Sequence, residues 1–285
     1  MNGFLNFYKP SGMSSAYALN KIKHLLPKGE TLGHMGTLDP LACGILPVAI
    51  GKSTRLFNYL LDKKKTYIAV FEFGYETDTL DKEGKIVFKT NYIPDENIIR
   101  NKISSFIGEI MQIPPVYSAK SIGGERSYAL ARKGVAEELP PKKVTVLNME
   151  LLEKISCSEY KFLIECKGGT YIRSISRDLG RNCNSFATMT ALERTRSGIF
   201  NKENSITLEQ LSACSDIEKL LIPPEKTVDF PEIRLSAEET ETVYNGKDFY
   251  ITYPDGIYRV FTPTEFYGIG EIQSGKLKVK AYLKV

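Results

Sequence analysis

The segment KTYIAVFEFG, residues 65–74, alternates apolar with other side chains and is rich in β-branched and aromatic residues. A period of two fits a half-buried strand, because successive side chains of a strand point to opposite faces of its sheet. The side chains on the apolar face are Tyr67, Ala69, Phe71 and Phe73. The chain therefore has to build a sheet with one covered face.

Other segments have the 3.6-residue spacing of helices. Residues 96–110 (ENIIRNKISSFIGEI) predict a core helix, and residues 56–61 (LFNYLL) predict the start of another. Residues 160–180 predict a strand, a glycine turn and a helix, which puts Arg173 in the first turn of that helix. Strand and helix patterns alternate without an internal repeat, so we expect a mixed α+β fold.

The last part of the chain differs from the rest. Beyond residue 230 short strand patterns alternate with turn signals, among them Asn245-Gly246 and Ser274-Gly275. We expect a small all-β module at 231–285, after a first domain at 1–230.

Residues 114–145 also stand apart from their neighbours. Two Pro-Pro pairs bracket a glycine-containing segment with several basic and tyrosine side chains. This composition predicts an exposed insertion at about 117–145. Its basic side chains include Lys120, Arg126 and Arg132.

The composition limits the class of protein. A net charge of +4 over 285 residues permits RNA binding without requiring it. Residues 231–285 carry seven Lys and Arg against eight Asp and Glu, so the positive excess lies in the first 230 residues. No run approaches the roughly 18 apolar residues of a membrane helix, and the N-terminus lacks the apolar region of a secretory signal. We expect a cytoplasmic protein.

Cysteine and histidine usage argues against two kinds of site. The five cysteines are scattered without a CxxC pair, which disfavours a disulfide framework and a zinc knuckle. The two histidines, His24 and His34, are too far apart in sequence for a paired ligand motif. We expect reduced thiols and no metal.

The most unusual stretch is GHMGTLDPLACGILPVAIGKSTR, residues 33–55. Asp39 lies among glycines, directly before Pro40 and ahead of an apolar run that predicts a buried strand. Glycines let a backbone approach a ligand closely, and proline stiffens the turn that carries the carboxylate. Taken alone, an Asp-Pro pair is more simply an Asx-turn. The GKST at 51–54 is a weak match to a phosphate loop, because that motif needs glycine where Leu46 stands.

Five segments together carry a resemblance to a known family. They are YKPSGMSS (8–15), the stretch at 33–55, KTYIAVFEFGYETDTLDKEGKI (65–86), QIPPVYSAKSIGGERSYALARKG (112–134) and GGTYIRSISRDLG (168–180). In content and order they resemble the bacterial tRNA pseudouridine-55 synthase family, TruB. The end of the chain is similar to the small PUA-type RNA-binding module that often closes these enzymes.

This resemblance implies a fold and a reaction. The fold would be a mixed, largely antiparallel sheet with flanking helices, an RNA-clasping insertion and a PUA-like C-terminal domain. The reaction breaks the N1–C1′ bond of a uridine in the T stem-loop of tRNA, turns the uracil and rejoins it through C5. It needs no cofactor, and we expect a monomer that requires no protein partner.

The resemblance also implies a catalytic trio. Asp39 matches the catalytic aspartate, which the reaction needs near the sugar anomeric carbon. Arg173 matches its cationic partner, although an arginine in a helix's first turn is more often a surface or phosphate-facing residue. Tyr67 matches the tyrosine that lies against the flipped base, although an isolated strand tyrosine is more simply core.

Further residues are expected to bind the substrate. Leu192 matches the apolar side of the base pocket, with ordinary core as its plainer interpretation. His34 matches a residue that fills the gap left by the flipped nucleotide, with a structural histidine as its alternative. Lys9 matches the YKP segment, which shapes the catalytic loop, and Tyr171 belongs to the matching TYIR segment. Lys120, Arg126 and Arg132 would neutralise phosphates from the insertion, whose plainer interpretation is a solvated loop.

Three alternatives compete with this interpretation. A non-catalytic RNA-binding or chaperone protein would not require the trio of Asp39, Tyr67 and Arg173. A guide-RNA-dependent synthase subunit usually carries longer basic tails than this chain has. A glycosidase would need a second carboxylate, which we cannot identify. The chain departs from the family pattern at Met35, Thr37 and Cys43, which flank the expected catalytic residue.

Overall fold

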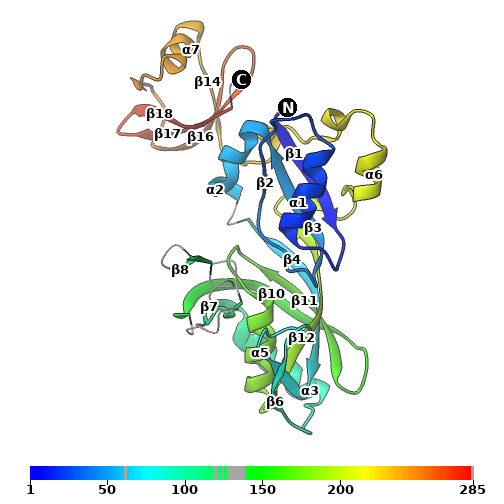
Figure 1. The fold of residues 1–285 in the computed structure, drawn as a ribbon. Helices are drawn as coiled ribbons and strands as arrows, with labels where there is room; N and C mark the ends of the chain where they lie inside the picture. The colour runs from blue at the N-terminus through cyan, green and yellow to red at the C-terminus, as the bar shows by residue number, and fades with distance from the viewer. Residues whose placement is uncertain (61–62, 118–120, 123–124, 127–138, 284–285) are drawn as a thin grey trace.

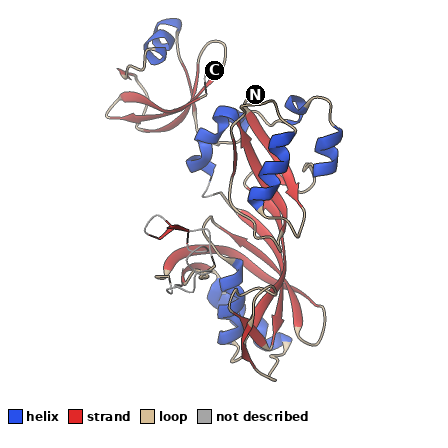
Figure 2. Ribbon diagram, in the orientation of Figure 1, coloured by secondary structure: helices blue, strands red, loops and turns tan. Residues whose placement is uncertain are grey.

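A computed structural model describes residues 1–60, 63–117, 121–122, 125–126 and 139–283. Within these residues the large sheet has nine strands (Figures 1 and 2). Its main order is β1 (Gly3–Lys9), β3 (Cys43–Ile50), β12 (Ala187–Ser197), β4 (Lys65–Phe73), β11 (Glu159–Cys166), β10 (Lys142–Lys154) and β7 (Gly108–Gln112). The short strands β2 (Leu32–His34) and β13 (Phe200–Asn201) pair with β3 and β12.

The sheet is antiparallel except at one junction. There β12 runs parallel to β3 for two residue pairs, Glu193 with Cys43 and Arg194 with Gly44. On its other side β12 is antiparallel to β4 over most of its length. A strand made late in the chain thus joins two parts of the sheet, and the expected mixed, largely antiparallel α+β fold is confirmed.

The predicted strand at 65–74 is confirmed as β4, and its predicted face is buried. That face lies in the main core, where α1 (Ser15–His24) and α5 (Ile172–Asn182) supply further apolar side chains. Figure 1 shows α1 and α6 (Leu208–Ala213) beside β1 and β3, and α3 (Glu96–Ile103) and α5 near the opposite end of the sheet.

The predicted helix at 96–110 is too long. Helix α3 is Glu96–Ile103, a 3-10 turn follows at Ser104–Phe106, and the chain then enters β7. Ile107 is already extended, with a φ of −83° and a ψ of 135°, and Gly108 follows with a φ of +102°. The helical spacing of Ile107 and Ile110 was therefore accidental, and Ile107 is exposed. The prediction at 56–61 holds in part, because α2 (Phe57–Leu60) follows a 3-10 turn at Gly51–Leu56.

The C-terminal part has a sheet of its own, with a separate apolar core. Its strand order is β14 (Glu232–Arg234), β16 (Gly256–Phe261), β17 (Phe266–Gln273), β18 (Lys276–Tyr282) and β15 (Phe249–Tyr250). The expected small β module is confirmed, with one helix that the sequence analysis did not expect: α7 (Ala237–Tyr244) begins with a capping box of Ser236 and Glu239.

The two sheets share a third apolar cluster. This cluster contains Phe4, Leu56 and Leu60 from the first part of the chain. From the C-terminal module it contains Ala281 of β18 and Leu283, just after that strand. Beside this cluster the Arg55 guanidinium donates to the Tyr282 carbonyl at 2.8 Å and lies 4.2 Å from the centre of the Tyr282 ring. The C-terminal module is therefore packed against the large sheet. No helix in the described part of the chain is long and apolar enough to cross a membrane.

Candidate active site

Asp39 lies in the loop between β2 and β3. Side chains from the N-terminal part of the chain fix the backbone of this loop by hydrogen bonds. The Ser15 hydroxyl donates to the Leu38 carbonyl at 2.7 Å and accepts from the Leu38 amide at 2.9 Å. The Ser11 hydroxyl donates to the Leu41 carbonyl at 2.7 Å. Gly36 takes a φ of +104°, which a residue with a Cβ adopts only under strain. The Asp39 backbone is thus fixed from both sides.

Arg194 is a support of this loop that the sequence reasoning missed. It is 1% exposed, and its guanidinium donates to the carbonyls of Ile45 at 2.7 Å, Gly36 at 2.9 Å and Thr37 at 3.4 Å. A buried guanidinium needs such acceptors. The sequence signal was the spacing Leu192-x-Arg194 on one strand, which puts both side chains on the same face.

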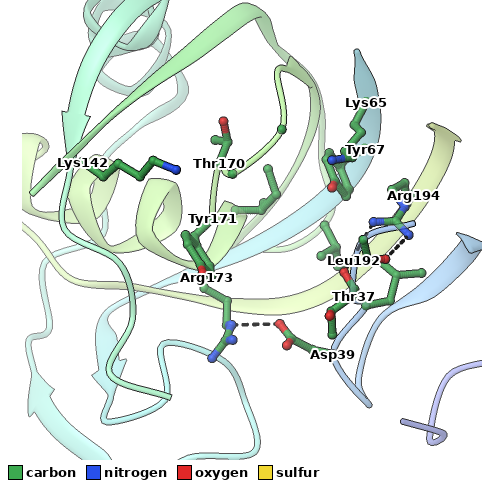
Figure 3. Close-up of a pocket in the computed structure, with 15 residues that line it drawn as sticks. Thr37, Asp39, Lys65, Tyr67, Lys142, Thr170, Tyr171, Arg173, Leu192 and Arg194 are labelled. Atoms are coloured by element: carbon green, nitrogen blue, oxygen red, sulfur yellow. Dashed lines mark hydrogen bonds and ion pairs between the residues drawn. The ribbon is translucent and has the colours of Figure 1, made fainter. Parts of the chain in front are cut away.

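Asp39 forms an ion pair with Arg173 across the site (Figure 3). Arg173 Nε lies 3.0 Å from Asp39 Oδ2, and the carboxylate remains partly exposed at 34%. Arg173 is 6% exposed and also donates to the carbonyls of Thr79 at 2.9 Å and Tyr117 at 3.0 Å. The guanidinium therefore holds the carboxylate in one orientation while leaving it accessible.

Arg173 points toward Asp39 from the first turn of α5, and the Gln112 side chain of β7 fixes the start of this helix. The Gln112 side chain accepts from the Tyr171 amide at 2.8 Å and donates to the Tyr171 carbonyl at 3.0 Å. The side-chain amide thereby pairs with both polar backbone groups of the N-cap residue of α5. The predicted place of Arg173 in the first turn is confirmed.

A second carboxylate, Asp81, stands behind Arg173. Its Oδ2 lies 3.6 Å from Arg173 Nη1, and its side chain is buried. Its other oxygen accepts from the Thr79 hydroxyl at 2.7 Å and the Glu83 amide at 3.1 Å. Sequence reasoning did not single out Asp81, although it lies within the ETDTLDKEG segment. One guanidinium thus lies between two carboxylates.

A cavity of about 400 Å³ opens beside the Asp39–Arg173 pair. Tyr67 and Leu192 line it from β4 and β12, and Tyr171 lines it from the start of α5. Burial raises the pKa of the Tyr67 phenol, so this group is neutral at ordinary pH. The cavity combines an apolar wall with one carboxylate and several cations, which suits a flat polar ligand.

The remaining predicted residues lie elsewhere. Lys9 is fully buried under the loop, where its ammonium donates to the carbonyls of Pro10 at 2.8 Å and Met13 at 2.6 Å. His34 ends β2 and is not among the residues that line the cavity. Arg126 belongs to the short strand β9 (Glu125–Arg126), which pairs with β8 (Ser121–Ile122). Lys120 and Arg132 lie outside the described residues, as does most of the predicted insertion.

The three departures from the family pattern are accommodated in different ways. The Met35 side chain joins the cluster shared with the C-terminal module, and Thr37 offers its carbonyl to Arg194. The Cys43 thiol accepts a hydrogen bond from the Tyr8 hydroxyl, with 3.5 Å between the atoms. The loop geometry is therefore complete with these side chains in place.

Comparison with known protein families gives three matches along the chain. Residues 23–172 match the TruB family pseudouridylate synthase N-terminal domain. Residues 173–229 match the tRNA pseudouridylate synthase B C-terminal domain, and residues 231–282 match the pseudouridine synthase II TruB C-terminal domain. Together the matches span both the candidate site and the C-terminal module.

Whole-chain relatives agree with these matches. The chain is 39% identical over 279 residues to tRNA pseudouridine synthase B of Clostridium kluyveri, with 95% of each chain covered. It is 36% identical over 290 residues to the protein of the same name from Aquifex aeolicus, covering 99% of this chain and 100% of that one.

Solved structures give a consistent picture. A Cbf5-Nop10-Gar1 complex contains a chain with a TM-score of 0.72 and 26% identity, covering 99% of this chain and 84% of that one. An H/ACA ribonucleoprotein bound to a substrate RNA contains one with a TM-score of 0.70 and 25% identity, with the same coverage. Family matches over nearly the whole sequence, together with relatives well above 30% identity, show that this chain belongs to the TruB family of pseudouridine synthases.

Proposed function

We propose that this protein converts the uridine at position 55 in the T loop of tRNA into pseudouridine, with Asp39 as its catalytic carboxylate. The observation that carries the proposal is the ion pair of Asp39 and Arg173 at the edge of a cavity lined by Tyr67 and Leu192. Family membership supports the reaction class, and this geometry supports our choice of residues.

The chemistry places two demands on the site. A carboxylate has to stand near the sugar anomeric carbon, where it acts as nucleophile or base, and it has to stay ionised. Arg173 lies 3.0 Å from the Asp39 carboxylate, and this ion pair fixes the rotamer of Asp39. The second demand is a place for the uracil while it turns, and the cavity beside the pair provides it.

The target base has to leave its stack in the T loop before it can enter. Base flipping costs roughly a few kcal/mol, and contact with aromatic and apolar side chains in the receiving pocket offsets it. Tyr67 and Leu192, both buried and both lining the cavity, are the residues that fit this role. His34 at the end of β2 would stack in the place that the flipped nucleotide leaves.

The same proposal covers the partners and setting of the enzyme. We propose that residues 1–230 form the catalytic domain, that residues 231–285 form a PUA-like RNA-binding domain, and that the protein acts as a monomer in the cytoplasm. Solved relatives with similar folds occur in complexes with other proteins. Here a single chain supplies the carboxylate, its cation and the cavity, so we propose that no protein partner is required.

The test is incubation of the purified chain with an unmodified T stem-loop RNA, followed by chemical mapping of pseudouridine. We expect product at the T-loop uridine, and none with the Asp39→Asn variant, which should still bind the RNA. Binding without product by the wild-type protein would instead support a non-catalytic RNA-binding role. An active Asp39→Asn variant would remove Asp39 from its catalytic role.

A further inference from the structure

The side chains that line the cavity carry more positive charge than the binding of a neutral base requires. Among the described residues that line it, four side chains are cationic and one is a carboxylate. The cations are Lys65, Lys142, Arg173 and Arg194, and the carboxylate is Asp39. Uracil is neutral when it enters such a pocket, so the excess positive charge calls for another explanation.

Two of the four cations contact the loop that carries Asp39, and a third lies at the edge of the cavity. Arg173 is paired with Asp39, and Arg194 holds the carbonyls of the catalytic loop. Lys142 is the exposed first residue of β10. Its ammonium lies beside Gly169, which also lines the cavity, at 3.5 Å from the position that a Cβ would take on this glycine. A lysine at a pocket mouth suits a backbone phosphate.

Lys65 lies deeper. It starts β4 two residues before Tyr67, so both side chains point to the same face of the strand. Only 7% of Lys65 is exposed. Figure 3 shows its side chain beside Tyr67, with Arg194 nearby on the neighbouring strand.

The distance from Lys65 to the catalytic loop is also short. The Lys65 ammonium lies 3.7 Å from the position a Cβ would take on Gly36, three residues before Asp39. On the other neighbouring strand Cys166 stands directly opposite Lys65, and it is buried. Burial of an ammonium costs free energy, and proteins bear this cost where the charge has a task.

The reaction creates a negative charge on the base that the cavity would hold. When the N1–C1′ bond breaks, its electron pair stays on the uracil and spreads over N1 and the two carbonyl oxygens. The pair then forms the C5–C1′ bond, after which C5 loses its proton and N1 gains one, so there is no net oxidation. If Asp39 instead added to the uracil ring, the negative charge would again develop on a carbonyl oxygen.

We propose that Lys65 is a catalytic residue whose ammonium contacts a carbonyl oxygen of the flipped uracil and stabilises the negative charge that develops on the base. The role rests on the proposed function. It assigns the two ends of the cavity to the two halves of the substrate: Asp39 and Arg173 act on the sugar side, and Lys65 acts on the departing base. A fixed cation in a dry pocket lowers the barrier because it needs no reorganisation during the reaction.

The test compares Lys65→Met with Lys65→Arg in single-turnover assays at saturating enzyme. We expect the Met variant to convert T stem-loop RNA roughly 100-fold more slowly, the loss typical of one removed electrostatic donor. The Arg variant should recover part of this loss, and the RNA dissociation constant of both should stay within about threefold of wild type, because the ground-state base is neutral.

A matched control is Lys64→Met. The Lys64 ammonium pairs with Glu165 at 2.7 Å, and its side chain is 44% exposed. This variant removes the same charge one residue away, and we expect its single-turnover rate to equal that of wild type. Lys65→Gln supplies a second neutral side chain for the case in which the Met variant fails to fold.

A second readout separates charge stabilisation from a structural role. Fluorine at C5 withdraws electrons from the ring, so 5-fluorouracil leaves more readily as an anion. With RNA that carries 5-fluorouridine at the target, we expect the rate deficit of Lys65→Met, read as loss of the N-nucleoside, to shrink at least about tenfold. A structural defect would slow both substrates equally.

Two failures are distinguishable. Wild-type protein that forms no pseudouridine overturns the proposed function before any variant is compared. Active wild-type protein with an equally fast Lys65→Met variant, or with a deficit that is the same for both RNAs, overturns only the role of Lys65.

Discussion

At the scale of single residues, the site depends on Arg173, whose guanidinium makes several polar contacts at the same time. Arg173 contacts Asp39 at 3.0 Å, Asp81 at 3.6 Å, and the carbonyls of Thr79 and Tyr117. The planar fork of arginine has donors in fixed directions, whereas lysine offers a compact charge on a flexible stem. Charge alone is therefore insufficient at this position.

Arg173→Lys is the variant that separates charge from geometry. We expect it to keep RNA binding and to lower the single-turnover rate roughly 100-fold or more, because Asp39 loses its fixed orientation. The rate of pseudouridine formation measures this effect, with tRNA binding measured in parallel. Wild-type activity in the Lys variant would contradict a requirement for the fork geometry.

Lys9 gives a prediction about pH and stability. Burial lowers its pKa from 10.5 to about 8, with nearby Cys43 and Asp39 opposing the shift. Below pH 8 both native and unfolded chains hold the proton, and the cost of burying the ammonium is complete. Between pH 8 and 10.5 the unfolded chain binds more protons than the native one, so the contribution of Lys9 to the free energy of unfolding rises with pH.

The measurement is denaturant unfolding of the wild-type protein and of Lys9→Met across this range. The difference in free energy, wild type minus variant, should increase between pH 8 and 10.5, since only the wild type carries the titrating group. A difference that does not change with pH would show that Lys9 titrates normally in the native protein.

At the scale of secondary-structure elements, the parallel junction of β3 and β12 depends on Gly44. It has a φ of +106°, and a Cβ placed on it would lie 2.2 Å from the Arg194 carbonyl oxygen. Both the backbone conformation and the strand contact exclude a side chain there. Arg194 in turn holds the loop that carries Asp39, so this glycine connects sheet packing to the site.

Gly44→Ala should therefore lower the free energy of unfolding by at least ~2 kcal/mol and also reduce activity. Gly12→Ala is the matched control, because Gly12 has a φ of +81° but no atom near its Cβ position. We expect the control to lose only about 1 kcal/mol. Thermal unfolding and pseudouridine formation measured on both variants would test this, and equal losses would contradict the close approach at Gly44.

The elements also show where sequence reasoning succeeded and where it stopped. Alternation predicted β4 and its buried face because local periodicity and burial coincide there. The helix at 96–110 was overextended, since nothing local distinguishes Gly108 in a helix from Gly108 at a φ of +102°. Helix α7 was missed although Ser236 and Glu239 form a recognisable capping box.

The candidate site divides in the same way. The family motifs predicted that Asp39 and Arg173 form a pair, and in the structure Arg173 Nε lies 3.0 Å from Asp39 Oδ2. Lys65, Asp81 and Arg194 were not named, because their importance comes from contacts between segments distant in sequence. The spacing of Leu192 and Arg194 puts both side chains on one strand face, but a single sequence does not show which distant groups they contact.

At the scale of the whole molecule, the shared apolar cluster makes the C-terminal module part of one packed body. Leu283 is 5% exposed in this cluster, next to Leu56 and Leu60 of the first part. A carboxylate placed there would have to be buried without a charge partner or would force the modules apart.

Leu283→Asp should therefore separate the unfolding of the C-terminal module from that of the large sheet. We expect calorimetry to show two transitions, and proteolysis to cut at the connection around residues 223–231. Tyr250→Asp is the control, because Tyr250 is 79% exposed and makes no contribution to the cluster. A single unchanged transition in Leu283→Asp would contradict docking through this surface.

The position of β12 has a consequence for the way the protein is made. It fills the place between β3 and β4, yet it begins at residue 187, more than 110 residues after β4 ends. During synthesis β2 covers part of the second edge of β3, but the edge of β4 that faces β12 has no partner until β12 arrives. Unpaired edges recruit other chains, and pairing across long sequence separations is slow. The growing chain is thus most prone to aggregate before residue 197 leaves the ribosome, and the cavity that β4 and β12 line is complete only after β12 has been made.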